Sequence, residues 1–331
     1  MAGDNKLNYC LDSLMNQKLP PEDFEVIAVD DASTDDSPRI LKEYEARYSN
    51  FRAILNQVNK RQGGAKNDGL KVATGDFVGF VDSDDFIHPE MFSRMLKKAS
   101  EEGADLVGCQ YSITYEQGPK VGRVVEVHNK NMEGSLSGDA LKAFMLCPGS
   151  MVVKIYDRSV IKENALSFPE HTFYEDNMAA PLWVSCFKKF ALVDEPLYYY
   201  YQHEQSTVHT ISRERLKNRM DMAVSMLEHM RKRPCYERVR DEVELNFIRI
   251  YCVNTLFSHM QSSKRTDFKL LCELRKGMRT LVPEYFRNPY YESTFSEEHR
   301  KLMQKAMRSP LFFALYYRML TAYRRLRYGR K

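Results

Sequence analysis

The sequence lacks the features that mark a membrane-spanning or a disulfide-stabilised protein. No apolar run approaches the ~20 residues that span a bilayer, and the N-terminus has no apolar segment of the kind found in secretory signals. The seven cysteines include no close pair with the spacing of a zinc site. An odd number of scattered cysteines fits a reduced, cytosolic interior better than a disulfide framework. There is no internal repeat and no low-complexity segment, so we expect a folded cytoplasmic protein.

Charge is distributed unevenly along the chain. The net charge of +4 conceals two regions of opposite sign. Residues 1–211 carry 22 basic and 32 acidic side chains, whereas residues 212–331 carry 27 basic and 13 acidic ones. Such a shift in composition marks a boundary. We therefore predict a first domain over residues 1–205 and a basic, helical region over residues 206–331.

Apolar strand-like runs alternate with helical patterns in the first part of the chain. The runs lie at residues 24–29, 51–55, 77–81 and 105–111, with two more at 189–193 and 197–203. This alternation predicts βαβ units, a mostly parallel sheet and therefore an α/β fold with helices on both faces. The paired glycines Gly63-Gly64 predict a polar loop over residues 56–64 before a short helix. Sheets of this class normally open with a strand, whereas this sequence opens with a helical pattern, so one central strand is expected to be missing.

Two of the predicted strands end in clusters of acidic residues. Asp30-Asp31 follow the first run, and Asp82-Ser83-Asp84-Asp85 follow the third. The carboxyl ends of parallel strands form the edge where open α/β sheets bind ligands. Crowded carboxylates repel one another unless a cation neutralises them, so the pattern predicts Mg²⁺ or Mn²⁺ bridging to phosphate oxygens. The alternative is a pair of solvated loops whose aspartates cap the following helices.

Five motifs, in order along the chain, resemble those of family 2 glycosyltransferases with the GT-A fold, the large bacterial group that builds surface polysaccharides. The resemblance covers about residues 5–205, and Lys66 stands where an arginine is usual. The motifs are Cys10-Leu11-Asp12-Ser13-Leu14-Met15-Asn16-Gln17, Val29-Asp30-Asp31-Ala32-Ser33-Thr34-Asp35, Gly63-Gly64-Ala65-Lys66-Asn67-Asp68-Gly69-Leu70, Gly75–Asp85, and Tyr174-Glu175-Asp176-Asn177 followed by Asp194–Tyr200.

The resemblance implies a nucleotide-binding half over residues 1–111 and an acceptor half over residues 112–205. It implies that Asp82 and Asp84 flank the metal ion and the donor ribose, with Asp84 as the first candidate for the direct metal ligand and Asp82 as the second. His203 is a further candidate for the metal or a phosphate, although a lone histidine after a strand is more often structural. The residues that the resemblance places at the nucleotide are Asp30, Asp31, Lys66, Asn67 and Asp82. Lys154 is a weaker candidate for contact with the donor or the acceptor.

Asp176 is the candidate general base, and Glu175 is its expected support. Both lie at the start of a predicted helix, where the helix dipole favours an ionised carboxylate. A base must be unprotonated to take a proton from an acceptor hydroxyl. Acidic residues are also common at helix starts for stability alone, which is the alternative interpretation.

The end of the chain is strongly basic and amphipathic. From His299 onward there are ten Lys and Arg residues and no acidic one. The apolar residues of the last predicted helix form a rough stripe: Leu311, Leu315, Met319, Tyr323 and Leu326. A basic amphipathic helix suits an anionic membrane surface, and the alternative is a terminal helix that packs on its neighbours. No nucleic-acid-binding module is recognisable, so we expect no nucleic-acid partner.

These patterns favour an inverting glycosyltransferase that moves a sugar from a nucleotide-sugar, a UDP-sugar in the first place, to a glycan or lipid-linked acceptor. Its expected place is the cytoplasm, peripherally at the inner face of the plasma membrane. One alternative is a metal-dependent nucleotidyltransferase, which would also group carboxylates around a nucleotide. Another is a degenerate, non-catalytic protein of the same fold that docks on a membrane or a partner.

Overall fold

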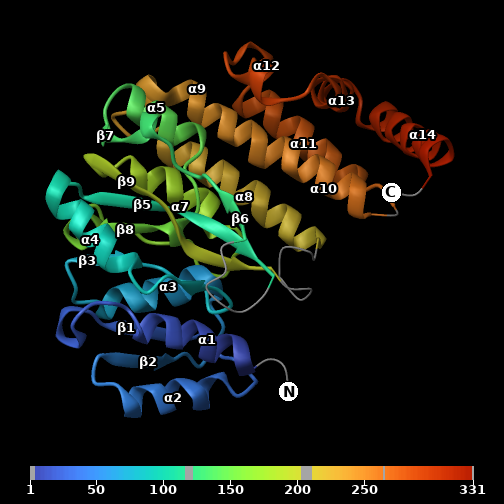
Figure 1. The fold of residues 1–331 in the computed structure, drawn as a ribbon. Coiled ribbons are helices and arrows are strands. Elements are labelled where there is room, and N and C mark those ends of the chain that lie inside the picture. The colour runs from blue at the N-terminus through green and yellow to red at the C-terminus, as the bar shows by residue number, and fades with distance from the viewer. Residues whose placement is uncertain (1–3, 116–121, 203–210, 264, 330–331) are drawn as a thin grey trace. The chain divides into compact units, whose positions relative to one another are not determined.

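The computed structural model describes residues 4–115, 122–202, 211–263 and 265–329 (Figure 1). The chain divides into two compact units, Met1–His209 and Thr210–Lys331. No helix in the described part of the chain is long and apolar enough to span a bilayer.

The first unit combines helices and strands. Its α-helices are α1 (Asp4–Met15), α2 (Ser37–Arg47), α3 (Arg61–Val72), α4 (Met91–Glu102), α5 (Asp139–Leu146), α6 (Arg158–Glu163) and α7 (Glu175–Val184). Its strands are β1 (Val26–Asp30), β2 (Phe51–Leu55), β3 (Phe77–Gly79), β4 (Phe86–Ile87), β5 (Leu106–Thr114), β6 (Arg123–Val125), β7 (Gly134–Ser135), β8 (Lys154–Asp157) and β9 (Lys189–Tyr201).

The described strands form two sheets. The smaller sheet consists of β1 and β2 in parallel. The larger sheet has the order β3-β8-β5-β9-β4, with β6 paired to β5 and β7 paired to β9. Only β5 and β9 run parallel in the larger sheet as described; its other pairs are antiparallel.

The predicted α/β class is therefore confirmed, but the sheet is mixed rather than mostly parallel. The pair of β5 and β6 shows one physical reason for the mixed sheet. β6 follows β5 after a short connection, and the two strands are antiparallel. A parallel pair would need a long crossover between its strands. Among the described strands β1 pairs with β2 alone and β3 with β8 alone, so β1 and β2 form a sheet separate from the larger one. The apolar side chains of Ile27, Ala28 and Val29 accordingly remain partly exposed.

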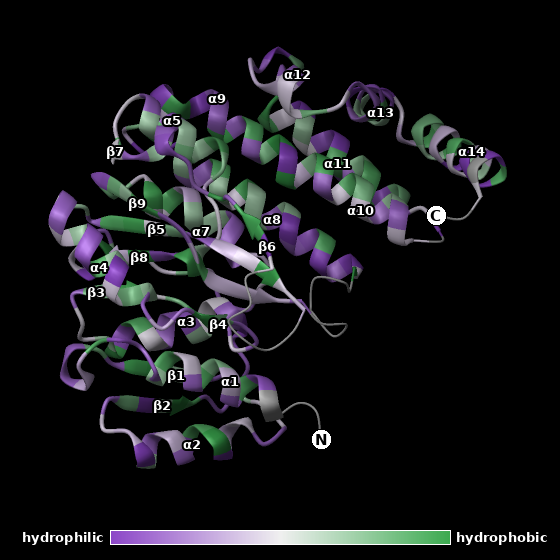
Figure 2. Ribbon diagram, in the orientation of Figure 1, coloured by the Kyte–Doolittle hydropathy of each residue, from purple (hydrophilic) through white to green (hydrophobic). Residues whose placement is uncertain are grey.

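The core of the first unit lies around β5 and β9, whose hydrophobic residues are visible in Figure 2. Val107 and Cys109 of β5 are fully buried, and α4 packs on this layer through Met91 and Met95. These apolar positions recur at helical spacing along α4, which is why this helix buries one face. The packed strands form a rigid base for the loops at their ends.

Two local predictions were wrong. α3 begins at Arg61, so Gly63 and Gly64 lie inside the helix and not in a loop. A Cβ atom on Gly63 would lie 2.0 Å from the carbonyl oxygen of Pro169, so this glycine permits close packing rather than a turn. β9 is a single strand where two were predicted, because an irregularity between Cys109 and Tyr111 of β5 accommodates its extra residues.

The second unit is helical. Its elements are α8 (Arg213–Met230), α9 (Tyr236–Phe247), a π-helix (Ile248–Asn254), α10 (Thr255–Ser262), α11 (Phe268–Leu281), α12 (Tyr291–Thr294), α13 (Glu297–Arg308) and α14 (Pro310–Tyr328). Pro310 opens α14, and the Ser309 hydroxyl accepts a hydrogen bond from the Phe312 amide. α11 ends at Leu281, two residues before Pro283, which cannot continue a helix.

Candidate active site

The first acidic cluster, at the end of β1, is tied to the backbone that follows. Asp30 is buried, and its carboxylate accepts a hydrogen bond from the Ser33 amide at 3.1 Å. Both carboxylate oxygens of Asp31 accept from the Lys60 amide, at 2.9 and 3.0 Å. The side chain of Asn56 donates to Asp31 as well, at 3.2 Å. Asp31 thus holds the loop that leads into α3, in addition to its predicted place at the nucleotide.

α3 carries Lys66 and Asn67, and the two side chains have different environments. Asn67 is buried, and its amide group donates to the Phe168 carbonyl and to Glu170, both at 2.9 Å. Its side-chain oxygen accepts from the Phe168 amide at 2.8 Å. Asn67 therefore clamps the loop 168–170, which gives it a structural role whatever it contributes to nucleotide binding.

Lys66 makes an ion pair with Glu175 across 109 positions of sequence. The distance from Lys66 Nζ to Glu175 Oε1 is 2.8 Å, and both side chains are largely buried. The ammonium group also lies 5.3 Å from the centre of the Phe168 ring. This pair connects α3 with the start of α7 and so joins the predicted nucleotide residues to the predicted base.

The second acidic cluster follows β3, and its carboxylates differ in burial and in hydrogen-bond partners. Asp85 is buried, and it accepts hydrogen bonds from the Tyr198 hydroxyl at 2.6 Å and the Tyr201 amide at 2.9 Å. Burial raises the pKa of Asp85 to about 8. Asp82 and Asp84 keep partial exposure to solvent. Asp85 therefore anchors the cluster to β9, and Asp82 and Asp84 are less enclosed than Asp85.

Asp176 lies in the first turn of α7, which follows a strained residue. Tyr174, directly before the helix, has φ of 64°, a left-handed conformation that is uncommon for a bulky side chain. Asp176 Oδ1 accepts a hydrogen bond from the Asn177 amide at 2.8 Å. Such strain persists only where the surroundings impose it, and it is frequent at functional sites.

The charges of Asp82, Lys66, Glu175 and Asp176 influence one another. Burial opposes the charge of Lys66, but Asp82 and Glu175 outweigh burial, and the pKa of Lys66 is raised. Burial raises the pKa of Asp82, and Lys66 acts in the opposite direction. Burial and then Glu175 raise the pKa of Asp176, which Lys66 again opposes. The structure thus brings one buried cation and three carboxylates into one electrostatic cluster.

Lys154 is the least expected member of this neighbourhood. It is 1% exposed, and its Nζ donates to the carbonyl groups of Pro148 and Ser150 at 2.9 and 2.6 Å. Burial lowers the pKa of Lys154 to about 7, and Asp176 is among the groups that oppose this shift. The sequence showed a lysine in a strand-like run but not that it clamps the loop before β8.

Two predicted features have no counterpart in the described site. His203 lies outside the described residues. Within the described ranges, no group of three His, Cys, Asp or Glu side chains is placed to hold a metal ion by itself.

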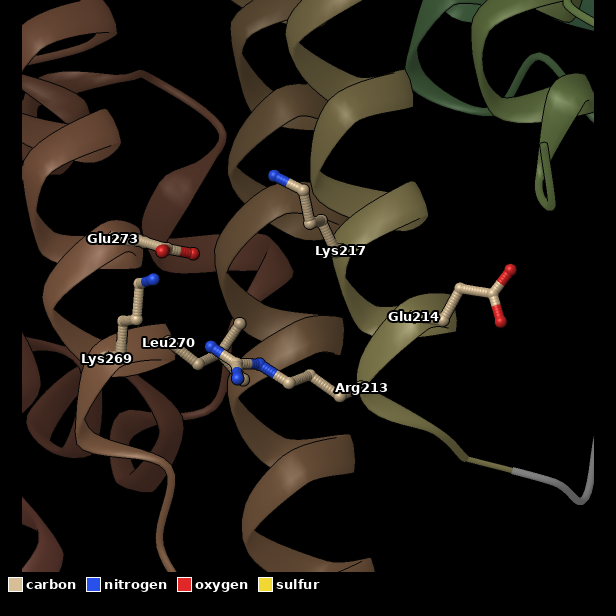
Figure 3. A pocket seen from close by; sticks show the side chains of 6 residues that line it. All are labelled: Arg213, Glu214, Lys217, Lys269, Leu270 and Glu273. Carbon is tan, nitrogen blue, oxygen red and sulfur yellow. The ribbon is translucent and has the colours of Figure 1, made fainter. Parts of the chain in front are cut away.

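A pocket of about 330 Å³ lies in the second unit, where Figure 3 shows Glu214 pointing away from Lys269 and Glu273. It contains none of the predicted site residues; its lining consists of Arg213, Glu214, Lys217, Lys269, Leu270 and Glu273.

Residues 4–161, just under half of the chain, match the family model described as glycosyl transferase family 2. Residues 4–161 therefore form a glycosyltransferase family 2 domain. The predicted family is thus confirmed, and it accounts for the order of the motifs from α1 to β8.

Two curated relatives illustrate the similarity. The poly(ribitol-phosphate) beta-glucosyltransferase of Bacillus spizizenii is 35% identical over 179 residues, which are 51% of this chain and 25% of that protein. The protein EpsH of Bacillus subtilis is 32% identical over 213 residues, which are 60% of this chain and 58% of that protein. The matches span less than two thirds of the length of either relative.

A solved structure extends the likeness over the whole chain. The S. aureus TarS 1-349 structure, in complex with UDP-GlcNAc, superimposes with a TM-score of 0.71 and covers 98% of this chain and 90% of its own. The sequence identity is 21%, so the comparison speaks to fold. The predicted GT-A fold is thereby confirmed.

Proposed function

We propose that this family 2 protein is an inverting glycosyltransferase that moves a sugar from a nucleotide-sugar to a hydroxyl group of a glycan or lipid-linked acceptor in surface-polysaccharide synthesis. The carrying observation is the buried Lys66–Glu175 ion pair, which joins the predicted donor residues to the predicted base. A nucleotidyltransferase would have no use for a carboxylate pair at the start of α7. UDP-sugars are the proposed donors, in line with the UDP-GlcNAc held by the TarS structure.

Asp176 is the proposed general base. Its raised pKa makes it a stronger proton acceptor than an ordinary carboxylate, because the optimal base has a pKa near the working pH. The bond from the Asn177 amide to Oδ1 leaves Oδ2 to take the proton of the acceptor hydroxyl. The acceptor oxygen attacks the anomeric carbon as the nucleoside diphosphate leaves, and this single displacement inverts the configuration.

Glu175 and Lys66 are the proposed positioning pair. The ion pair fixes the first turn of α7 against α3, so that the neighbouring carboxylate of Asp176 is held in place. The positive charge of Lys66 also limits the rise in the pKa of Asp176 and so keeps more of the base ionised. Asp30, Asp31 and Asn67 are proposed to line the nucleoside side, where their hydrogen bonds already order the loops.

The carboxylates after β3 fit a hard divalent cation. Burial and the repulsion of Asp84 raise the pKa of Asp82, as expected where negative groups crowd together. Mg²⁺ in nucleotide enzymes commonly takes one or two protein carboxylates and completes its shell with phosphate and water. We propose that Asp82 and Asp84 hold Mg²⁺ or Mn²⁺, with His203 as a further candidate ligand. When bound, the ion would supply positive charge beside the diphosphate.

The test is a screen of nucleotide-sugars with the purified protein, with and without Mn²⁺, for sugar transfer or donor hydrolysis. The proposal expects release of a nucleoside diphosphate from at least one donor. Release of pyrophosphate from a nucleoside triphosphate would instead indicate a nucleotidyltransferase. Absence of turnover with every donor, in a protein that still binds UDP, would indicate a non-catalytic member of the family.

A further inference from the structure

The last helix, α14, carries a continuous exposed apolar face. Met319 is 72% exposed and Leu326 is 88% exposed. At about 100° per residue, the Cα positions of the exposed apolar residues fall within an arc of about 140°. The residues of this arc, which we call the apolar face, are Leu311, Phe312, Leu315, Tyr316, Met319, Tyr323 and Leu326.

The opposite face of α14 is already packed within the second unit. Phe313 and Ala314 are buried, and the Phe313 and Tyr317 rings lie 5.7 Å apart. Tyr317 also lies 6.5 Å from the ring of Phe257 on α10. The helix therefore has its own core contacts through one side. The apolar face is a second surface, far larger than the single exposed apolar residues that are normal in proteins.

Basic side chains border the apolar face on both sides. By the same helical geometry Arg318 and Arg325 lie along one border and Arg327 along the other. Lys305 of α13 adds a charge, with its Nζ 4.5 Å from the Tyr316 ring centre. The Arg318 guanidinium donates to the Ser263 carbonyl at 2.7 Å, which fixes it at this border. No acidic residue occurs from His299 to the end of the sequence.

We propose that the apolar face of α14 binds the surface of an anionic membrane. Apolar side chains would enter the boundary between headgroups and acyl chains, and the bordering arginines would contact lipid phosphates, as in interfacial amphipathic helices. A second copy fits this surface less well, because two-fold pairing of the same face would bring its arginine borders together. The proposal stands on α14 alone and does not depend on the transfer reaction.

The experiment is flotation of the full chain with vesicles of phosphatidylcholine alone, or with about one third phosphatidylserine. We expect binding to the anionic vesicles that weakens as salt is added. The triple variant L315Q/M319Q/L326Q should lose about tenfold or more of this binding. The variant R325Q/R327Q should lose the preference for phosphatidylserine by about tenfold or more.

The matched control is V58Q/F286Q, which replaces two exposed apolar residues that do not belong to α14. It should bind vesicles as the unchanged protein does, and all variants should keep their thermal midpoints because the changed side chains are exposed. Equal binding to both vesicle types, or no binding to either, would overturn the proposal. So would a dimer in solution that the triple variant converts to a monomer without any change in vesicle binding. Donor turnover is measured separately, in detergent-free buffer without vesicles. A failure of the proposed reaction can then be distinguished from a failure of vesicle binding.

Discussion

Lys66 on α3 and Glu175 at the start of α7 form a buried ion pair with Nζ and Oε1 2.8 Å apart. Lys66 and Glu175 both act electrostatically on Asp82, in the acidic cluster after β3, and on Asp176, the candidate base. Asp82 and Asp176 thus belong to one electrostatic cluster, in which Lys66 opposes the rise in the pKa of each. This relationship underlies the proposed roles, in which Asp176 is the base and Lys66 and Glu175 position it.

Replacing Lys66 with methionine should destabilise the fold. Glu175 would then be a buried charge without its cation, and such losses cost about 3–5 kcal/mol. The free energy of unfolding in urea measures the effect. The control is K66R, which preserves the charge and should remain within about 1 kcal/mol of the unchanged protein. Equal stability of K66M and K66R would contradict the structural importance of the pair.

Replacing Asp176 with asparagine should preserve donor binding and abolish transfer. Loss of a general base lowers the rate by about 10²–10⁴-fold. D139N, at an exposed carboxylate in the first turn of α5, is the matched control and should keep full activity. If D176N turns over at the normal rate, another residue is the base.

As the pH is lowered, the rate of transfer should begin to fall at a higher pH than it would with an ordinary carboxylate base. Asp176 acts as a base only when ionised, and burial together with Glu175 raises its pKa. The rate should therefore decline as pH falls through that raised pKa, above the range in which exposed aspartates titrate. A pH profile of kcat/KM measures this limb. A rate that stays constant down to pH ~4 would show that no group with a raised pKa is needed.

Lys154 should make the fold more stable as pH rises above neutrality. Its folded pKa of about 7 lies below the ordinary lysine value, so above pH 7 the unfolded chain holds the extra proton. The free energy of unfolding should rise with pH until the unfolded lysine also titrates, by up to about 1.4 kcal/mol per pH unit. K154M should lack this component, while the titrations of all other groups remain common to both proteins. Parallel curves for the two proteins between pH 7 and 9 would contradict the assignment.

Two glycines of α3 should respond in opposite directions to alanine. In G63A the new Cβ would lie 2.0 Å from the Pro169 carbonyl oxygen, so the backbone must move, at a cost of about 1–3 kcal/mol. In G69A the nearest atom, on Val29, is 3.6 Å away, and alanine should be neutral or stabilising by up to about 1 kcal/mol. Thermal midpoints compare the two. Similar values for both variants would show that α3 does not pack closely on the 168–170 loop.

Much of the first unit could be predicted because its strands are short apolar runs, two of which lead into clusters of acidic residues. β2 begins and ends where the apolar run at residues 51–55 places it. The start of α3 was missed because paired glycines are typical of loops. The glycine at position 63 is instead needed for close packing against Pro169, about a hundred residues away in the sequence. The Lys66–Glu175 pair and the clamp by Lys154 were missed for the same cause, since tertiary contacts leave no local pattern.

The most direct test of the central claim is a calorimetric titration of UDP into the unchanged protein and into D84A, each with and without Mn²⁺. The account predicts that Mn²⁺ strengthens UDP binding to the unchanged protein and has no effect on D84A, because the carboxylates after β3 bind the diphosphate only through the cation. UDP affinity that is the same in all four titrations would contradict it.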